Sequence, residues 1–156
     1  MGLTLARYRA DCCCLCGSSN ELSGEHKIKA SLLRTEFGTE QMVIGRFDGE
    51  PNNTRLAQSP KSKAFHFTAR MCKRCNNERT QAADKEFVRF HNMVRQQMQN
   101  GFDPSQIFAE PYYQVGAPRY LNVFRYFAKL LCCHVAESNG PRRLHVARFA
   151  MGEVHR

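Results

Sequence analysis

The stretch DCCCLCGSSNELSGEH, residues 11–26, holds four cysteines in six positions and ends on an acidic residue beside a histidine. Within it Cys13 and Cys16 form a Cys-x2-Cys knuckle, and the only other pair with that spacing is Cys72 and Cys75. Two such knuckles can bind one tetrahedral zinc ion through four thiolates, with Zn–S bonds of ~2.3 Å. A redox Cys-x2-Cys is the alternative for either knuckle alone. Together they predict a structural four-cysteine zinc site.

The other four cysteines are not expected to bind the metal. Cys12 and Cys14 flank the first knuckle, and a register that uses Cys14 in place of Cys13 is left open. Cys132 and Cys133 lie inside an apolar, helix-like segment, where buried or half-buried thiols are expected rather than a second metal site.

Composition sets the class of protein. The chain has 156 residues, 42% of them hydrophobic, enough for one domain with a core and an extension. Its 23 Lys+Arg against 14 Asp+Glu give a formal charge of +9, which favours a nucleic-acid partner over a membrane; an ordinary basic surface is the alternative. No apolar run approaches the roughly 18 residues of a membrane span, and residues 1–10 lack the apolar core of a signal peptide. Cytoplasmic localisation with reduced cysteines is therefore expected.

Hydrophobic periodicity predicts the elements around the knuckles. We expect a short helix over 28–37, a strand over 41–47, a polar loop over 48–63, a strand over 65–71 that runs into Cys72, a helix from 76 to about 100, and a helix over 119–137. The inward side of the last helix is expected to carry Leu121, Phe124, Phe127, Leu131 and Val135. Arg125 and Lys129 share its polar face, as solvated cations or as a phosphate-binding pair.

The order of these motifs resembles that of the HNH endonuclease family. Cys13-x2-Cys16 is followed by Glu25-His26 and then by Cys72-x2-Cys75-Asn76, as in the four-cysteine branch that includes phage Holliday-junction-resolving endonucleases. CNNERTQAADKEF, which begins at Cys75, is similar to the helix of bacterial HNH proteins, and the match covers roughly residues 12–90. The resemblance implies an α+β fold: a small ββα-metal motif braced by zinc in a nuclease domain over 10–100, followed by a helical extension over 101–156 that packs on it. It also implies a bacterial, phage or mobile-element setting.

The resemblance implies a role for each site residue. His26 would be the general base, and Glu25 and Asn76 would hold a catalytic Mg²⁺ or Mn²⁺; an imidazole near neutral pKa and two oxygen ligands suit phosphodiester hydrolysis. His66 is the candidate that orients the base, with a plain strand histidine as the alternative. Asn77 and Asp84 are expected to be a turn residue and a solvated helix residue. Six nearby cations are expected to bind the nucleic-acid backbone: Lys27, Lys29, Arg70, Lys73, Arg74 and Arg79.

The expected function is therefore that of a metal-dependent endonuclease, with DNA favoured over RNA as the substrate. The alternative is a zinc-binding module that binds DNA or RNA without cutting it, and a structural interaction protein is the third possibility. A homodimer sealed by the helix over 119–137 is left open.

Overall fold

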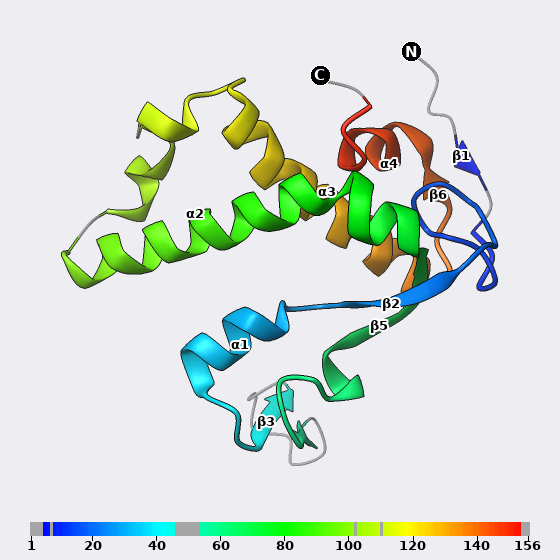
Figure 1. The fold of residues 1–156 in the computed structure, drawn as a ribbon, viewed down its shortest axis with the longest axis horizontal. Helices are drawn as coiled ribbons and strands as arrows, with labels where there is room; N and C mark the ends of the chain where they lie inside the picture. The colour runs from blue at the N-terminus through cyan, green and yellow to red at the C-terminus, as the bar shows by residue number, and fades with distance from the viewer. Residues whose placement is uncertain (1–4, 7, 46–53, 102, 110, 154–156) are drawn as a thin grey trace. The chain divides into compact units, whose positions relative to one another are not determined.

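The chain is a small mixed α+β protein with short sheets and helices (Figure 1). The structure, a computed structural model, describes residues 5–6, 8–45, 54–101, 103–109 and 111–153. It divides the chain into two compact units, one of Met1–Ser23 with Ala69–Arg156 and the other of Gly24–Thr68. Each unit is described by itself below.

The elements are short apart from two helices. The strands are β1 (Leu5–Ala6), β2 (Leu22–His26), β3 (Met42–Gly45), β4 (Thr54–Ala57), β5 (His66–Cys72) and β6 (Arg142–Arg143). The α-helices are α1 (Ala30–Phe37), α2 (Gln81–Gln99), α3 (Pro118–Glu137) and α4 (Leu144–Ala150), with 3-10 turns η1 (Lys63–Phe65), η3 (Pro104–Ala109) and η4 (Pro111–Tyr113) and a π-helical turn η2 (Cys75–Arg79). Among the described residues, none of these helices combines the length and apolar character that crossing a membrane requires.

The strands pair two by two, as β1 with β6, β2 with β5 and β3 with β4. Along β5 the side chains alternate as the sequence predicts: Phe67, Ala69 and Met71 are buried, whereas Thr68 and Arg70 are exposed. The predicted strand over 65–71 is therefore confirmed, and it does run into the second knuckle.

The unit Gly24–Thr68 has its own small core. Leu33 on α1 packs with Ala57 on β4 and with Phe65, all at most 5% exposed. α1 ends where predicted, at Gly38, whose φ of 75° favours glycine. The predicted loop over 48–63 is wrong at 54–57, where the chain forms β4 and pairs with β3. Ala57 at the end of β4 is buried in this core, and the other three side chains of the strand are exposed. Residues 46–53, part of the predicted strand and loop, lie outside the described residues.

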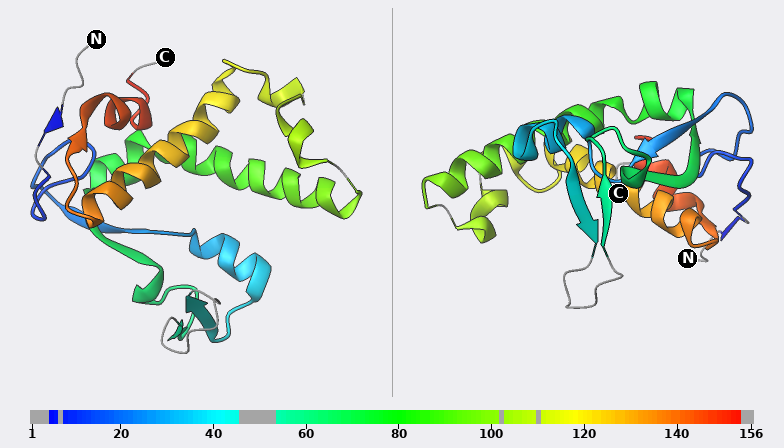
Figure 2. Two further views of the ribbon diagram at one scale, coloured as in Figure 1. Left: turned by 180° about the vertical axis from the view of Figure 1, so that it is seen from behind. Right: turned by 90° about the horizontal axis from the view of Figure 1, so that it is seen from below.

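Helices α2 and α3 form the centre of the other unit. They lie side by side, and α4 lies beside α3 (Figures 1 and 2). The Phe87 ring on α2 stacks on the Tyr126 ring on α3, with centroids 3.8 Å apart. Both helices belong to the unit of Met1–Ser23 with Ala69–Arg156.

The face of α3 that packs inward differs from the predicted one. Phe124, Phe127 and Leu131 are 36%, 47% and 50% exposed, so the predicted inward face was wrong for them. The buried side chains of α3 are Val123, Tyr126, Lys129, Cys132, Cys133 and Ala136. The reason is that two amphipathic side chains, Tyr126 and Lys129, are buried on the inner side of α3. There the Tyr126 ring stacks on Phe87 and the Lys129 ammonium group pairs with Asp84.

A buried ion pair joins α2 to α3. The Lys129 Nζ donates to Asp84 Oδ1 at 2.7 Å, and the Lys129 side chain is 0% exposed. Both expectations for these residues, a solvated Asp84 and a Lys129 that is solvated or phosphate-binding, are therefore wrong: each charge satisfies the other. Arg125 also faces the protein, since its guanidinium lies 5.6 Å from the Phe149 ring.

Candidate metal centre

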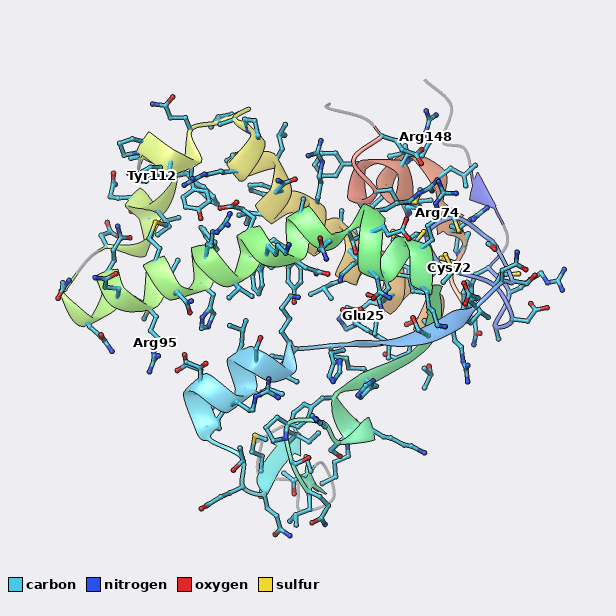
Figure 3. All side chains as sticks on the ribbon, viewed as in Figure 1. Glu25, Cys72, Arg74, Arg95, Tyr112 and Arg148 are labelled. Carbon is cyan, nitrogen blue, oxygen red and sulfur yellow. The ribbon has the colours of Figure 1, made fainter. Side chains whose placement is uncertain are left out.

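The four cysteines of the two knuckles come together in the first unit. Their sulfur atoms all lie within 4.8 Å of one another, and Cys16 Sγ lies 3.6 Å from Cys72 Sγ. Figure 3 shows sulfur atoms gathered around the labelled Cys72. A tetrahedral Zn–S₄ centre with ~2.3 Å bonds has S–S edges of about 3.8 Å, so the cluster fits a structural metal such as zinc. Cys13 and Cys75 are buried and Cys16 half-buried, and four thiolates would leave no open coordination position.

A tight turn shapes the first knuckle. The Cys13 N–H donates to Ser18 O at 2.7 Å, and the Gly17 N–H donates to Cys13 O at 2.9 Å. Gly17 has φ +80°, and a Cβ there would collide with the guanidinium of Arg142. That guanidinium also donates to Leu15 O at 3.4 Å. Glycine at 17 therefore lets an arginine from the C-terminal region lie against the knuckle.

The second knuckle sits where β5 turns into helix. The Cys75 N–H donates to Cys72 Sγ at 3.4 Å, the type of bond that stabilises a thiolate. The π-helical turn that follows is tied by Thr80, which is 0% exposed and whose hydroxyl donates to Cys75 O at 3.0 Å. The strand-to-helix corner was predicted, and its π-helical geometry was not.

Backbone hydrogen bonds join the two knuckles. The Cys14 N–H donates to Arg70 O at 2.9 Å, and the Lys73 N–H donates to Glu21 O at 3.0 Å. Residues more than 50 positions apart in sequence are thus held in register by main-chain hydrogen bonds as well as by the sulfur cluster.

Hydrogen bonding within the cluster favours one thiolate. The bond from the Cys75 thiol lowers the pKa of Cys13 to about 4, and the same bond, with burial, raises the pKa of Cys75. A cluster that already holds one negative sulfur near neutral pH is suited to a cation, which would displace the remaining protons.

Cys14 is turned away from this cluster. Its Sγ lies 3.6 Å from Cys133 Sγ, and both side chains are at most 1% exposed. The contact with Cys133 and burial raise the pKa of Cys14, and burial raises the pKa of Cys132 to about 12. The structure therefore selects the register with Cys13, and the expected buried thiols at 132 and 133 are confirmed.

Glu25, His26 and His66 belong to the unit Gly24–Thr68. Glu25, labelled in Figure 3, is 7% exposed on β2, and His26 follows it at the end of that strand. The His26 and His66 rings lie 3.8 Å apart between centroids, at 44°. The structure thus brings the predicted base and its predicted orienting residue into contact.

Asn76 lies in the other unit, in η2 directly after the second knuckle. Its Nδ2 donates to Ser23 Oγ at 3.3 Å, and the Ser23 hydroxyl donates to Met71 O at 3.0 Å. The Asn76 amide is therefore held in a defined orientation by β2 and β5.

The predicted nucleic-acid contacts differ in exposure and pairing. Lys73 and Arg74 are exposed and pair with Glu21 at 3.1 Å and Glu78 at 3.9 Å; such surface pairs are weak, so a phosphate can replace the carboxylate. Arg79 is half-buried, where it contacts Glu153 at 3.3 Å. Arg70 is exposed on β5, and Lys27 and Lys29 are half-buried in the unit Gly24–Thr68.

Three residues at the metal centre were not predicted from the sequence: Ser23, Arg142 and Met151. The Met151 Sδ lies 3.6 Å from Cys75 Sγ and 3.2 Å from Arg79 Nη1, so the residues after α4 cover one side of the cluster. Nothing in the sequence marks these residues, because each acts through tertiary contact and not through spacing from a cysteine.

Comparison with known proteins found no matching family model, no matching curated protein and no matching solved structure.

Proposed function

We propose that this chain is a metal-dependent endonuclease that hydrolyses phosphodiester bonds in nucleic acid, with DNA as the preferred substrate. One observation carries the proposal: the strands that border the two knuckles, β2 and β5, pair with each other and carry Glu25-His26 and His66 at their other ends. With α2 they supply the two strands and the helix of a ββα-metal motif, in which α1 and the β3–β4 hairpin form an insertion. The HNH-like order of motifs supports the same interpretation.

The proposed chemistry divides between the side chains. His26 accepts a proton from the attacking water, and contact with the His66 ring fixes the orientation of the imidazole. A bound Mg²⁺ or Mn²⁺ would stabilise the charge that develops on the phosphate and on the departing 3′ oxygen as the P–O bond breaks. The Glu25 carboxylate and the Asn76 amide oxygen are ligands of the hard type that such an ion prefers.

The cysteine cluster has a separate, structural role in this proposal. Four thiolates saturate a tetrahedral zinc ion and leave no position for water or phosphate. Zinc would therefore hold β2, β5 and the start of η2 together while a second, oxygen-bound metal takes part in cleavage.

Nicking of supercoiled plasmid tests the proposal. Wild type with Mg²⁺ or Mn²⁺ should nick the plasmid and EDTA should stop it, while His26→Ala should lose about 10²–10⁴-fold in rate and still bind DNA and zinc. The nicking rate of His66→Ala should lie between the rates of wild type and His26→Ala. The matched control is His145→Ala, an exposed histidine of α4, which should cut like wild type. A wild type that cuts neither DNA nor RNA, or a fully active His26→Ala, would leave the zinc-braced binding module as the function.

A further inference from the structure

The outward face of α3 carries a continuous apolar stripe. Phe124, Phe127 and Leu131 are 36%, 47% and 50% exposed. Tyr120 precedes them and His134 follows, so the five positions are separated by four, three, four and three residues. That spacing is the seam of a helix that packs along a second helix. Within the chain, the Phe127 ring contacts Phe87 of α2 at 5.4 Å and the Phe124 ring contacts Phe108 of η3 at 5.6 Å between centroids. The stripe is therefore the part of these side chains that the packing inside the chain leaves exposed.

The charges along α3 fit an antiparallel copy of the same helix. Arg119 lies at the N-terminal end, and Glu137, at the last position, is the only acidic residue of α3. An antiparallel pair centred between Phe127 and Leu131 places Arg119 of one copy opposite residue 139 of the other, about 3 Å along the axis from Glu137. A two-fold axis makes this contact twice, and the helix dipoles then also oppose each other favourably. A parallel pair would put Arg119 beside Arg119.

A small hollow borders the C-terminal part of the stripe. It is lined by Leu131, Cys132, Val135, Pro141, Arg143 and Val146. In the antiparallel arrangement Phe127 of the second copy lies opposite Leu131, and Phe124 lies opposite His134 and Val135. The rings of one copy thus lie against the rim of this hollow, which at about 20 Å³ is too small to admit them.

We propose that the outward face of α3 binds α3 of a second copy of this chain, antiparallel and about a two-fold axis. Phe124, Phe127 and Leu131 form its centre, and Arg119 and Glu137 of opposite copies form its rim. The inference concerns assembly, so it stands or falls independently of the proposed nuclease activity.

Sedimentation velocity of the full chain over a wide concentration range tests the apolar centre. Wild type should form a dimer, and Phe127→Lys should be monomeric with unchanged zinc content and far-UV circular dichroism. The matched control is Phe37→Lys, which places the same charge on a 65% exposed phenylalanine of α1 and should leave the dimer intact. A wild type that stays monomeric, or a Phe127→Lys that dimerises like wild type, overturns the proposal. If Phe127→Lys lowers oligonucleotide affinity without changing mass, nucleic acid is the occupant of this face.

A charge exchange tests the orientation. Arg119→Glu and Glu137→Arg should each weaken the dimer at low salt, and the double variant should restore it, because every rim pair is then again of opposite charge. In a parallel dimer Arg119→Glu alone would not weaken association through this pair, and the double variant would restore nothing. That result would exclude the antiparallel arrangement.

Discussion

Cys72 is the cysteine whose loss should be most costly. It is 5% exposed at the end of β5, its Sγ lies 3.6 Å from Cys16 Sγ, and it accepts the Cys75 N–H. Because structural zinc contributes ~10–16 kcal/mol apparent free energy in small zinc-binding peptides, Cys72→Ser should release the metal and destabilise the fold. The measurements are zinc content by elemental analysis and thermal unfolding.

The control for that variant is a cysteine next to the cluster but outside it. Cys12 is half-buried and contacts the exposed carboxylate of Asp11, so Cys12→Ser should keep zinc and stability. Wild type that is folded and free of zinc, or a Cys72→Ser that retains one zinc per chain, would contradict the structural-zinc assignment.

The ligand cysteines could be predicted at the residue scale, and their surroundings could not. Cys-x2-Cys spacing is a local geometric requirement, so it identified Cys13, Cys16, Cys72 and Cys75 without any knowledge of the fold. Strand alternation put His66 on the polar side of its strand, and its ring contacts His26. Its orienting role stays a prediction. Ser23 and Met151 carry no such signal, since their contacts with Asn76 and Cys75 depend on packing between distant segments.

At the scale of elements, the Lys129–Asp84 pair is the contact that should matter most for the packing of α2 on α3. The Lys129 side chain is fully buried, and the Asp84 side chain is 14% exposed. Lys129→Met removes the partner of a mostly buried carboxylate, which typically costs about 3–5 kcal/mol; partial exposure of Asp84 favours the lower end of that range. Urea unfolding should show the loss.

An exposed lysine on the facing helix provides the comparison. Lys85 on α2 is exposed and contacts Gln81 Oε1 at 3.3 Å, so Lys85→Met should change stability by no more than about 0.5 kcal/mol. Equal effects of the two substitutions would show that the buried pair contributes no more than a surface lysine.

The helices could be predicted more reliably than the faces they bury. α1, α2 and α3 occur where the periodicity placed them, and Gly38 and Gly101 follow α1 and α2. The face of α3 was mispredicted because large apolar side chains lie on both of its sides, so periodicity alone could not show that Tyr126 would be buried while Phe127 stays 47% exposed at the edge of the contact with α2. β4 was missed because only Ala57 of its four residues is buried.

At the scale of the whole molecule, the residues named in the proposed function come from both units. The proposed general base His26 and the proposed metal ligand Glu25 belong to Gly24–Thr68, whereas Asn76 and the cysteine cluster belong to the other unit. The division was not predicted, because β2 and β5 each run from one unit into the other as single strands. The proposal requires Glu25 and Asn76 to serve one catalytic cation, and kinetics can examine that requirement directly.

The decisive measurement is the Mg²⁺ dependence of the nicking rate for Glu25→Ala, Asn76→Ala and the double variant, with the exposed neighbour Asn77→Ala as the control. Each single variant should need more Mg²⁺ for half-maximal rate and recover part of its activity at high Mg²⁺. The nicking rate of the double variant should be only slightly below that of the less active single variant. This non-additivity corresponds to a coupling energy within the ~0.5–3 kcal/mol seen for residues that share a partner. Independent, multiplying effects of the two substitutions, or Mg²⁺ curves identical to that of wild type, would contradict a shared catalytic metal.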